Sequence, residues 1–472
     1  MAGSNGVVRA GHGCSALTTF STFALFAALA IAPVRAQQNI PPAPSPSATP
    51  PASVPSAPAP QPSPPVKERF LVDKFPDKPS LSPTLTIPID SLGFTAPGPI
   101  YLGSRNSMAS LDFLDENHLL FTFRIPGLLH RDQLSGGDAE ERQIRAVVLS
   151  LPKGDVEAQD TWTVHDRVRY LWPLNNGHFL LRDRNNLLEG DRTLTLKPYL
   201  DFPGPLLWIE LDPSQHFLVT NSLEPVAKPA KPAQTENAAP ASGSSASDST
   251  SATGADSPDL VVRILHRNSG DVMLVSRVRT AVHLAINSDG YLENTRDRGM
   301  DWILSLSYFT GGSHMLGRVQ SNCEPDDQFL SEQEILSTTC GPSGESGLVA
   351  MTTAGKLLWQ SQAPATEVWP QLAVAANGSR FAWETLDTTH AIYAYAPLSP
   401  DDVKEQSVTV FDAANGDIAM VSPVSPILDA GGNVAVSPSG RRVALLNAGG
   451  IQVFDLPAPP PLPANITNPS SK

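Results

Sequence analysis

The sequence lacks the short motifs that mark common enzyme and metal-binding classes. It has no GxSxG nucleophile turn, no HExxH zinc helix, no CxxCH haem site and no phosphate-binding loop. We place Asp112, Asp212, Asp289 and Asp412 in or beside turns, where short side chains cap local N–H groups, so their spacing does not support a paired-carboxylate mechanism. We therefore lean against an enzyme, and expect no catalytic residues, no metal and no cofactor.

Charged residues are scarce, at 17%, and the formal net charge is −14. An acidic chain repels the phosphate backbone, which argues against general nucleic-acid binding. Long helical patterns are also missing, because no apolar run at helical spacing extends over 12 residues after position 40. The 33 glycines and 46 prolines interrupt helices and supply turns, so the composition favours many short strands.

Cysteine is rare, with only Cys14, Cys323 and Cys340 in the chain. Cys14 lies before an apolar segment, where a lipidated cysteine would have to follow it. The pair Cys323 and Cys340 favours a disulfide over two buried thiols if the protein is exported, and closing this loop stabilises by about 3 kcal/mol. A metal site is disfavoured because no CxxC accompanies the pair.

The first 36 residues are typical of an export signal. Arg9 precedes an apolar core at about residues 20–33, and Val34-Arg35-Ala36 offers a small, x, small cleavage site. An uncleaved anchor is the alternative, because residues 16–34 are nearly long enough to span a bilayer. Cleavage leaves no stable membrane span. We expect an exported protein, either periplasmic or at the cell surface or secreted.

Three further segments read as disordered. Residues 37–66 hold 12 prolines and form a linker, which is either an extended spacer or a leader without a role. An insertion at 223–258 is nearly all Ala, Pro, Ser, Thr and Asp, and a tail follows at 460–472. Residues 67–107 follow the linker as a lead-in segment. Residues 108–459 are the folded domain, and the 223–258 insertion lies within it.

The folded domain repeats one unit, a strand, a tight turn and a second strand. The clearest copy is NVAVSPSGRRVALL at 433–446, and imperfect copies occur at 111–120, 172–181, 209–219, 284–292 and 372–383. A second unit, an apolar run closed by Gly-Asp or Gly-Lys, occurs at 147–155, 262–271, 349–356 and 408–417. Two hairpins per repeat, stacked many times, indicate a solenoid or a propeller.

We divide the domain into seven repeats, and six or eight stay open because residues 322–340 show no clear strand pair. The repeats are 108–166, 167–202, 203–280, 281–321, 322–366, 367–426 and 427–459. The last one lacks a fourth strand, which we expect the lead-in segment to supply through Pro99–Gly103. Such closure removes the exposed edges of a ring of sheets.

The repeats resemble those of YVTN-type and quinoprotein-like bacterial β-propellers. The resemblance rests on SPSG at 437–440 followed by RRVALL, on VFDAANGD and on MTTAGKLLW, and covers about residues 95–459. It implies an all-β, seven-bladed propeller with disordered Pro-rich termini, and implies no particular activity, because this fold carries many.

Propeller geometry places the connections after each second strand, and those between blades, on one face. Three long insertions, 127–141, 223–258 and 387–406, therefore share a face, which we call the loop face. Variable loops on a rigid scaffold are where binding is usually found. Two Arg-Asp-Arg triplets and a neighbouring connection fall on the same face, and their binding candidates are His165, Asp166, Arg167, Arg169, Arg182, Asp183, Arg184, Arg296, Asp297 and Arg298.

Converging guanidinium groups would recognise carboxylates or phosphates bidentately, whereas ion pairs between blades are the alternative for the same residues. His118, His178 and His216 share one repeat position on the other face, too far apart for a metal, and are expected to be structural.

These observations favour a binding or scaffold module for a protein or an anionic envelope component. The alternatives are a periplasmic oxidoreductase or hydrolase acting at the channel mouth, and a purely structural surface protein. The sequence leaves the oligomeric state open.

Overall fold

The computed structural model describes residues 68–70, 81–126, 130–131, 140–225, 259–280, 282–392 and 398–460. The predicted signal peptide (1–36) and linker (37–66) lie outside these residues, as do nearly all of the tail and most of the 223–258 insertion. The described residues form 29 strands and four short 3-10 helices, with no α-helix among them. Within these ranges no helix has the length and apolar character needed to cross a membrane.

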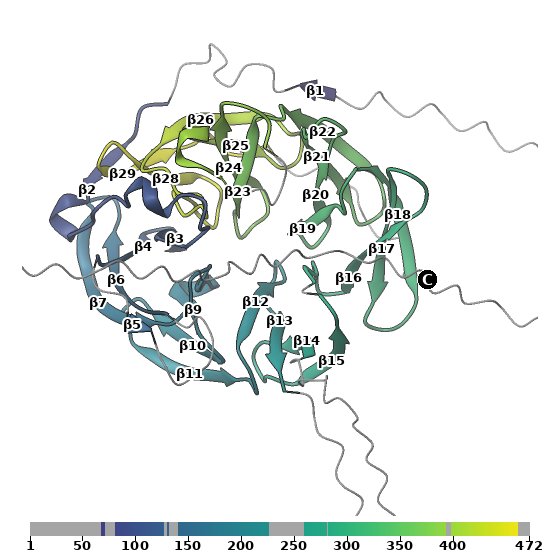
Figure 1. Ribbon diagram of the computed structural model, residues 1–472, viewed down its shortest axis with the longest axis horizontal. Coiled ribbons are helices and arrows are strands. Elements are labelled where there is room, and N and C mark those ends of the chain that lie inside the picture. The colour runs from purple at the N-terminus through teal and green to yellow at the C-terminus, as the bar shows by residue number, and fades with distance from the viewer. Residues whose placement is uncertain are drawn as a thin grey trace, which may run out of the picture. The chain divides into compact units, whose positions relative to one another are not determined.

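The strands form seven mainly antiparallel sheets that follow one another around a ring (Figure 1). Blade 1 contains β3 (Ala109–Asp115), β4 (His118–Arg124), β6 (Glu140–Ser150) and β7 (Asp155–Val164), with β5 (His130–Arg131) beside β6. Blade 2 contains β8 (Leu171–Pro173), β9 (His178–Asp183), β10 (Asn186–Asp191) and β11 (Leu196–Asp201). Blade 3 contains β12 (Leu206–Leu211), β13 (Phe217–Glu224), β14 (Asp259–His266) and β15 (Val272–Val278).

Blade 4 contains β16 (Gly290–Arg296), β17 (Asp301–Tyr308) and β18 (Ser313–Gln320), and a single bridge from Ile286 to Tyr291 stands where its inner strand would be. Blade 5 contains β19 (Asp326–Ser331), β20 (Glu334–Cys340), β21 (Ser346–Thr352) and β22 (Leu357–Ala363). Blade 6 contains β23 (Glu367–Val374), β24 (Arg380–Thr388), β25 (Val403–Asp412) and β26 (Ile418–Val424). Blade 7 contains β27 (Val434–Val436), β28 (Arg442–Asn447), β29 (Gly450–Asp455) and β2 (Leu85–Pro88).

The seven-bladed all-β fold predicted from the repeats is confirmed. The segment that left the blade number open, residues 322–340, contains the hairpin of β19 and β20. The Ser437–Gly440 segment forms the tight turn that its serine, proline and glycine residues predict. Gly440 adopts a φ of +68°, its N–H donates to the carbonyl of Ser437, and the hydroxyl of Ser437 accepts from the N–H of Arg442.

The core of the propeller lies between blades. The described residues contain seven clusters of buried apolar side chains, and each combines residues from two consecutive blades. Between blades 5 and 6, for example, Trp359 stacks on Phe381 and Phe411. The cluster of blades 7 and 1 is one of the seven, so the apolar contacts run around the whole ring.

The ring closes through β2, which pairs antiparallel with β29 from Leu85 opposite Val453 to Pro88 opposite Gly450. The prediction that Pro99–Gly103 supplies this strand was wrong. Residues Pro99–Tyr101 form a 3-10 helix with proline in its first turn. Proline favours that position because its φ is fixed near the helical value, and it cannot donate a ladder hydrogen bond.

Three 3-10 helices besides this one complete the described structure: Asp90–Leu92, Asn175–Gly177 and Pro400–Asp402. A short strand, β1 (Glu68–Phe70), pairs in parallel with the outer strand β22 and adds a fifth strand to the sheet of blade 5.

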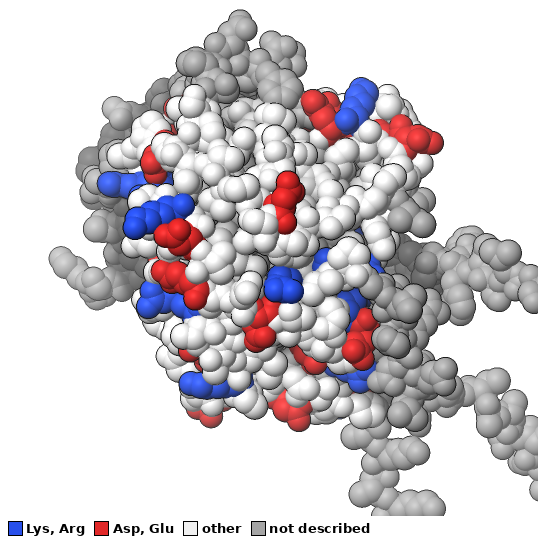
Figure 2. All heavy atoms as spheres, turned by 90° about the vertical axis from the view of Figure 1, so that its left-hand side faces the viewer, with Lys and Arg blue, Asp and Glu red and all other residues white. Residues whose placement is uncertain are grey.

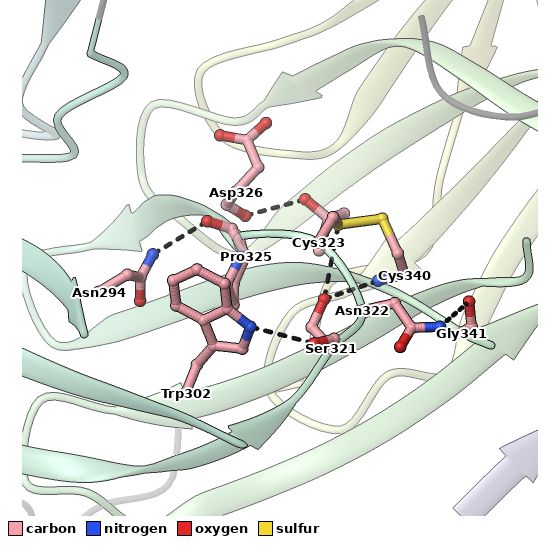
Figure 3. Close-up of a disulfide and its surroundings, with 10 residues drawn as sticks. Asn294, Trp302, Ser321, Asn322, Cys323, Pro325, Asp326, Cys340 and Gly341 are labelled. Carbon is pink, nitrogen blue, oxygen red and sulfur yellow. Dashed lines mark hydrogen bonds between the residues drawn. A yellow bond between two sulfur atoms is a disulfide. The ribbon is translucent and has the colours of Figure 1, made fainter. Parts of the chain in front are cut away.

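The predicted disulfide between Cys323 and Cys340 is present and joins the approach to β19 with the end of β20 (Figure 3). Ser321 connects it to blade 4, because the Ser321 hydroxyl accepts from the N–H of Cys340 at 3.0 Å and its carbonyl accepts from the Trp302 indole at 3.0 Å. A disulfide is consistent with an oxidising compartment, such as export provides.

We predict that Ile87→Ala lowers the free energy of unfolding by about 2 to 4 kcal/mol, because Ile87 is buried in the cluster that joins blades 7 and 1. Urea unfolding of the variant beside Thr86→Ala measures this effect. Thr86 is exposed on the same strand, so its change should have little effect. Equal stability of both variants would contradict closure through β2.

Candidate functional site

Five of the predicted binding residues come together where blade 1 connects to blade 2. The Nδ1 and backbone N of His165 each lie 2.9 Å from Oδ1 of Asp183. Oδ2 of Asp166 accepts from the N–H of Arg184 at 3.2 Å and lies 3.2 Å from Nε of Arg182. Hydrogen bonds and an ion pair therefore hold the first Arg-Asp-Arg turn against the connection between blades 1 and 2.

Arg182 is the centre of this cluster and is only 1% exposed. Its Nη1 donates to the carbonyl of Leu207 at 2.5 Å, and its guanidinium lies 5.8 Å from the ring centroid of Trp172. Burial raises the pKa of Asp166, and the charge of Arg182 opposes that rise. A guanidinium used in this way cannot present a bidentate fork to a ligand, so Arg182 holds blades 1, 2 and 3 together.

The second triplet lies on blade 4 and makes its own contacts. Nε of Arg296 donates to the carbonyl of Gly299 at 2.9 Å, and the guanidinium lies over Trp302. Asp297 pairs with Arg318 on β18, and Arg298 is exposed. These contacts lie within blade 4, whereas those of the first triplet lie where blade 1 connects to blade 2.

A different group of charges lines the channel. Nε2 of His283 lies 3.0 Å from Oε2 of Glu210, and Nδ1 lies 2.6 Å from Oδ1 of Asp326. Glu210 is on the inner strand of blade 3, His283 precedes the inner segment of blade 4, and Asp326 begins the inner strand of blade 5. Contacts that join the inner strands of three consecutive blades lie on the channel wall.

Arg169, one of the predicted binding residues, extends this group toward blade 1. Its Nε donates to the carbonyl of Leu171 at 3.1 Å, and its guanidinium lies 5.4 Å from the ring centroid of Trp172. Burial lowers its pKa, while the carboxylates of Asp112 and Glu210 act in the opposite direction. We call Asp112, Arg169, Glu210, His283 and Asp326 the channel belt, in which negative and positive residues alternate.

Three residues of the belt, Arg169, His283 and Asp326, lie at its loop-face end. Arg169 and His283 precede the inner strands of their blades, and Asp326 is the first residue of β19. Inner strands begin at the loop face, because the connections between blades lie there. Asp112 lies farther along its strand, in the middle of β3, and is buried. Its predicted place in or beside a turn was wrong, because β3 continues through Asp115 and the hairpin turn is at Glu116 and Asn117.

His283 is held in its charged form. Burial alone lowers the pKa of its imidazole, but the carboxylates of Glu210 and Asp326 outweigh this effect and raise the pKa to about 11. The ring of Trp208 lies against it, with centroids 5.6 Å apart. A histidine that keeps its proton cannot act as a general base near neutral pH.

A buried polar network lies where blade 6 meets the connection into blade 7, and it joins Glu384 on β24, Gln406 on β25 and Asn433. Nε2 of Gln406 donates to Oε1 of Glu384 at 2.6 Å, and the same amide exchanges hydrogen bonds with the backbone of Leu428. Nδ2 of Asn433 donates to Gln406 and to the carbonyl of Pro426. Burial raises the pKa of Glu384 to about 8, so this network carries a neutral carboxyl at neutral pH and fixes the connection into blade 7.

The three repeat-equivalent histidines have separate partners. His118 lies 2.7 Å from Asp115, His178 lies 3.2 Å from Glu189, and His216 lies 3.1 Å from the hydroxyl of Ser214. In the part of the chain that the structure describes, no group of three or more His, Cys, Asp or Glu side chains could hold a metal ion.

No protein-family model matches the chain, and no curated protein matches it. Among solved structures, the chain is similar to the uncomplexed acylaminoacyl peptidase of Pyrococcus horikoshii, with 11% identity, a TM-score of 0.44, and coverage of 76% of this chain and 54% of that one. It is also similar to the β-propeller domain of the Trilobed protease from Pyrococcus furiosus, with 9% identity, a TM-score of 0.42, and coverage of 75% and 99%.

The chain thus spans about half the length of the acylaminoacyl peptidase that it matches. The propeller fold implied by the YVTN-type and quinoprotein-like resemblance is confirmed by the seven sheets, and no narrower family is identified.

We predict that the stability contributed by His283 depends on pH. The folded state keeps a proton that the unfolded chain releases above a pKa of about 6.5, so this contribution is full below 6.5 and is lost as pH rises through about 11. Urea unfolding of the parent and of His283→Gln across this range should show the largest difference at the acidic end.

His314→Gln, on the exposed outer strand β18, is the matched control. A difference between the parent and His283→Gln that does not change with pH would show that the imidazole carries no extra proton in the folded state.

Proposed function

We propose that this chain is a binding module whose protein ligand enters the channel from the loop face and contacts the channel belt. One observation carries this proposal: ionisable side chains from the inner segments of blades 3, 4 and 5 contact one another, and two of them, His283 and Asp326, lie at the loop-face ends of those segments. Rigid strands hold these side chains in place, which limits the entropy that a ligand must overcome on binding.

The chemistry of the belt favours a basic group on the ligand. The belt contains three carboxyl groups against two cations, and the chain as a whole is acidic. The side chain of Asp326 is 44% exposed and that of His283 is 35% exposed, so both are within reach. A lysine or arginine of a partner protein could pair with Asp326 and Glu210, while Arg169 and His283 could donate to its carbonyl groups.

The arginines predicted to bind an anion give less support. Arg182 is buried in contacts within the protein, and Arg296 is bonded to its own turn. On the side of the molecule that carries blades 7 and 1, basic and acidic side chains are interspersed (Figure 2). An anionic ligand would therefore depend on exposed groups such as Arg298, where screening by solvent weakens ion pairs.

The proposal is tested by titrating the purified chain with short extended peptides that carry a central lysine or arginine, and with matched peptides that carry glutamate. Fluorescence of Trp208, which lies against His283, reports entry into the channel. We expect the basic peptides to bind more tightly, and Glu210→Gln with Asp326→Asn to weaken them about tenfold or more, since tenfold corresponds to about 1.4 kcal/mol.

Asp160→Asn is the matched control, because Asp160 is an exposed carboxylate on the outer strand β7. Binding of the glutamate peptides in preference would replace this proposal with an anionic ligand. Binding that is unchanged in the Glu210 and Asp326 variant would place the ligand elsewhere, and cleavage or conversion of a peptide would support an enzyme at the channel mouth.

A further inference from the structure

The outer strand of each blade is an edge that other chains could pair with, and most of these strands are protected. β7 carries Asp155, Glu157 and Asp160, and β22 is covered by β1. Proline interrupts three others, at Pro198 of β11, Pro423 of β26 and Pro88 of β2, and β18 carries the ion-paired Arg318. Charges, proline and covering segments are the devices that prevent edge-to-edge pairing.

β15, the outer strand of blade 3, differs from the other six. Its sequence is VMLVSRV, with four consecutive apolar residues and one charge, Arg277. Val272 is 50% exposed, Met273 39% and Val275 55%, and these are among the few large apolar side chains that the described surface exposes. Within the described residues β15 pairs with β14 alone, so its other edge presents backbone N–H and C=O groups.

We propose that β15 pairs antiparallel with β15 of a second copy of this chain, about a two-fold axis that passes through Val275. In this register Val272 lies opposite Val278 of the second copy, and Met273 lies opposite Arg277. No like charges face each other within the strands. Directly opposed residues share one face of the joined sheet, so the exposed methyl groups of Val275 meet across the axis.

The flanking charges fit the same register. Asp271, just before β15, lies level with Arg279 of the second copy, and the symmetry repeats this pair at the other end. Both residues are exposed. Opposite charges at both ends of a strand pair favour the antiparallel direction, because a parallel pair in the same alignment would place Asp271 beside Asp271 and Arg279 beside Arg279.

The propeller already extends one of its sheets in this way. β1 pairs with the outer strand of blade 5, which shows that a blade of this chain accepts a further strand at its outer edge. A strand of seven residues is about 24 Å long, so an interface made by β15 alone is at the small end of specific interfaces. The dimer should therefore be weak and should depend on concentration.

Sedimentation velocity of the full chain between about 1 and 100 μM tests this proposal. We expect the parent to shift from monomer to dimer over this range. Val275→Lys places two like charges on the axis and should leave a monomer, and its exposed position should leave the fold intact. Val156→Lys is the matched control, since Val156 is 46% exposed on β7, and it should dimerise like the parent.

A cysteine at the axis tests the register. Val275→Cys should form a disulfide-linked dimer on oxidation, because the two residues lie opposite each other, whereas Met273→Cys should cross-link poorly, because it lies opposite Arg277. A parent that remains monomeric, a Val275→Lys variant that still dimerises, or equal cross-linking at both positions would overturn the proposal. A monomeric parent would leave this edge to an extended segment of another protein.

Discussion

The structure depends on the closure of a ring of sheets by the pairing of β2 with β29. Each blade buries apolar side chains against both of its neighbours, and no cluster of the described core belongs to one blade alone. A blade is therefore stable only where a neighbour covers each face. The last pair of faces, between blades 7 and 1, meets only when the chain end near Leu85 joins the strand at Gly450–Asp455. Six of the seven clusters join blades that follow one another in the sequence, whereas this one requires the two ends of the propeller to meet.

Closure also accounts for the channel belt. The inner strands converge around one axis, so side chains from different blades that face this axis become neighbours. Charged groups there are partly removed from water, and each of them needs a partner. His283 meets this need by standing between Glu210 and Asp326, and Arg169 meets it by lying between Asp112 and Glu210. The alternation lets the wall carry charge without strong repulsion, and leaves Asp326 accessible from the loop face.

The sequence predicted the features that depend on local chemistry. Turns such as Ser437–Gly440 require particular residues, so the repeats and the blade number could be read from them. The disulfide could be predicted because Cys323 and Cys340 are the two cysteines of the folded domain. The burial of individual side chains could not be predicted from local sequence. Arg182 was a candidate for ligand binding because the repeats place its Arg-Asp-Arg triplet on the loop face, whereas a carbonyl and an acid from neighbouring segments enclose its side chain.

The belt was missed for a related reason. Glu210, His283 and Asp326 lie in three different repeats, and no local spacing links them. Alignment of the repeats offered one usable indication, because Asp112 and Glu210 occupy the same position before their hairpin turns. The prediction of a strand at Pro99–Gly103 was wrong. The apolar residues suggested a strand, but Pro99 favours the first turn of a 3-10 helix.

Amide hydrogen exchange of the full chain, with and without a bound basic peptide, tests the central claim most directly. The account predicts added protection at the loop-face ends of the inner strands, near residues 169–172, 206–211, 282–286 and 326–328, with the outer strands unchanged. Protection confined to the outer strands or to the opposite face would contradict it.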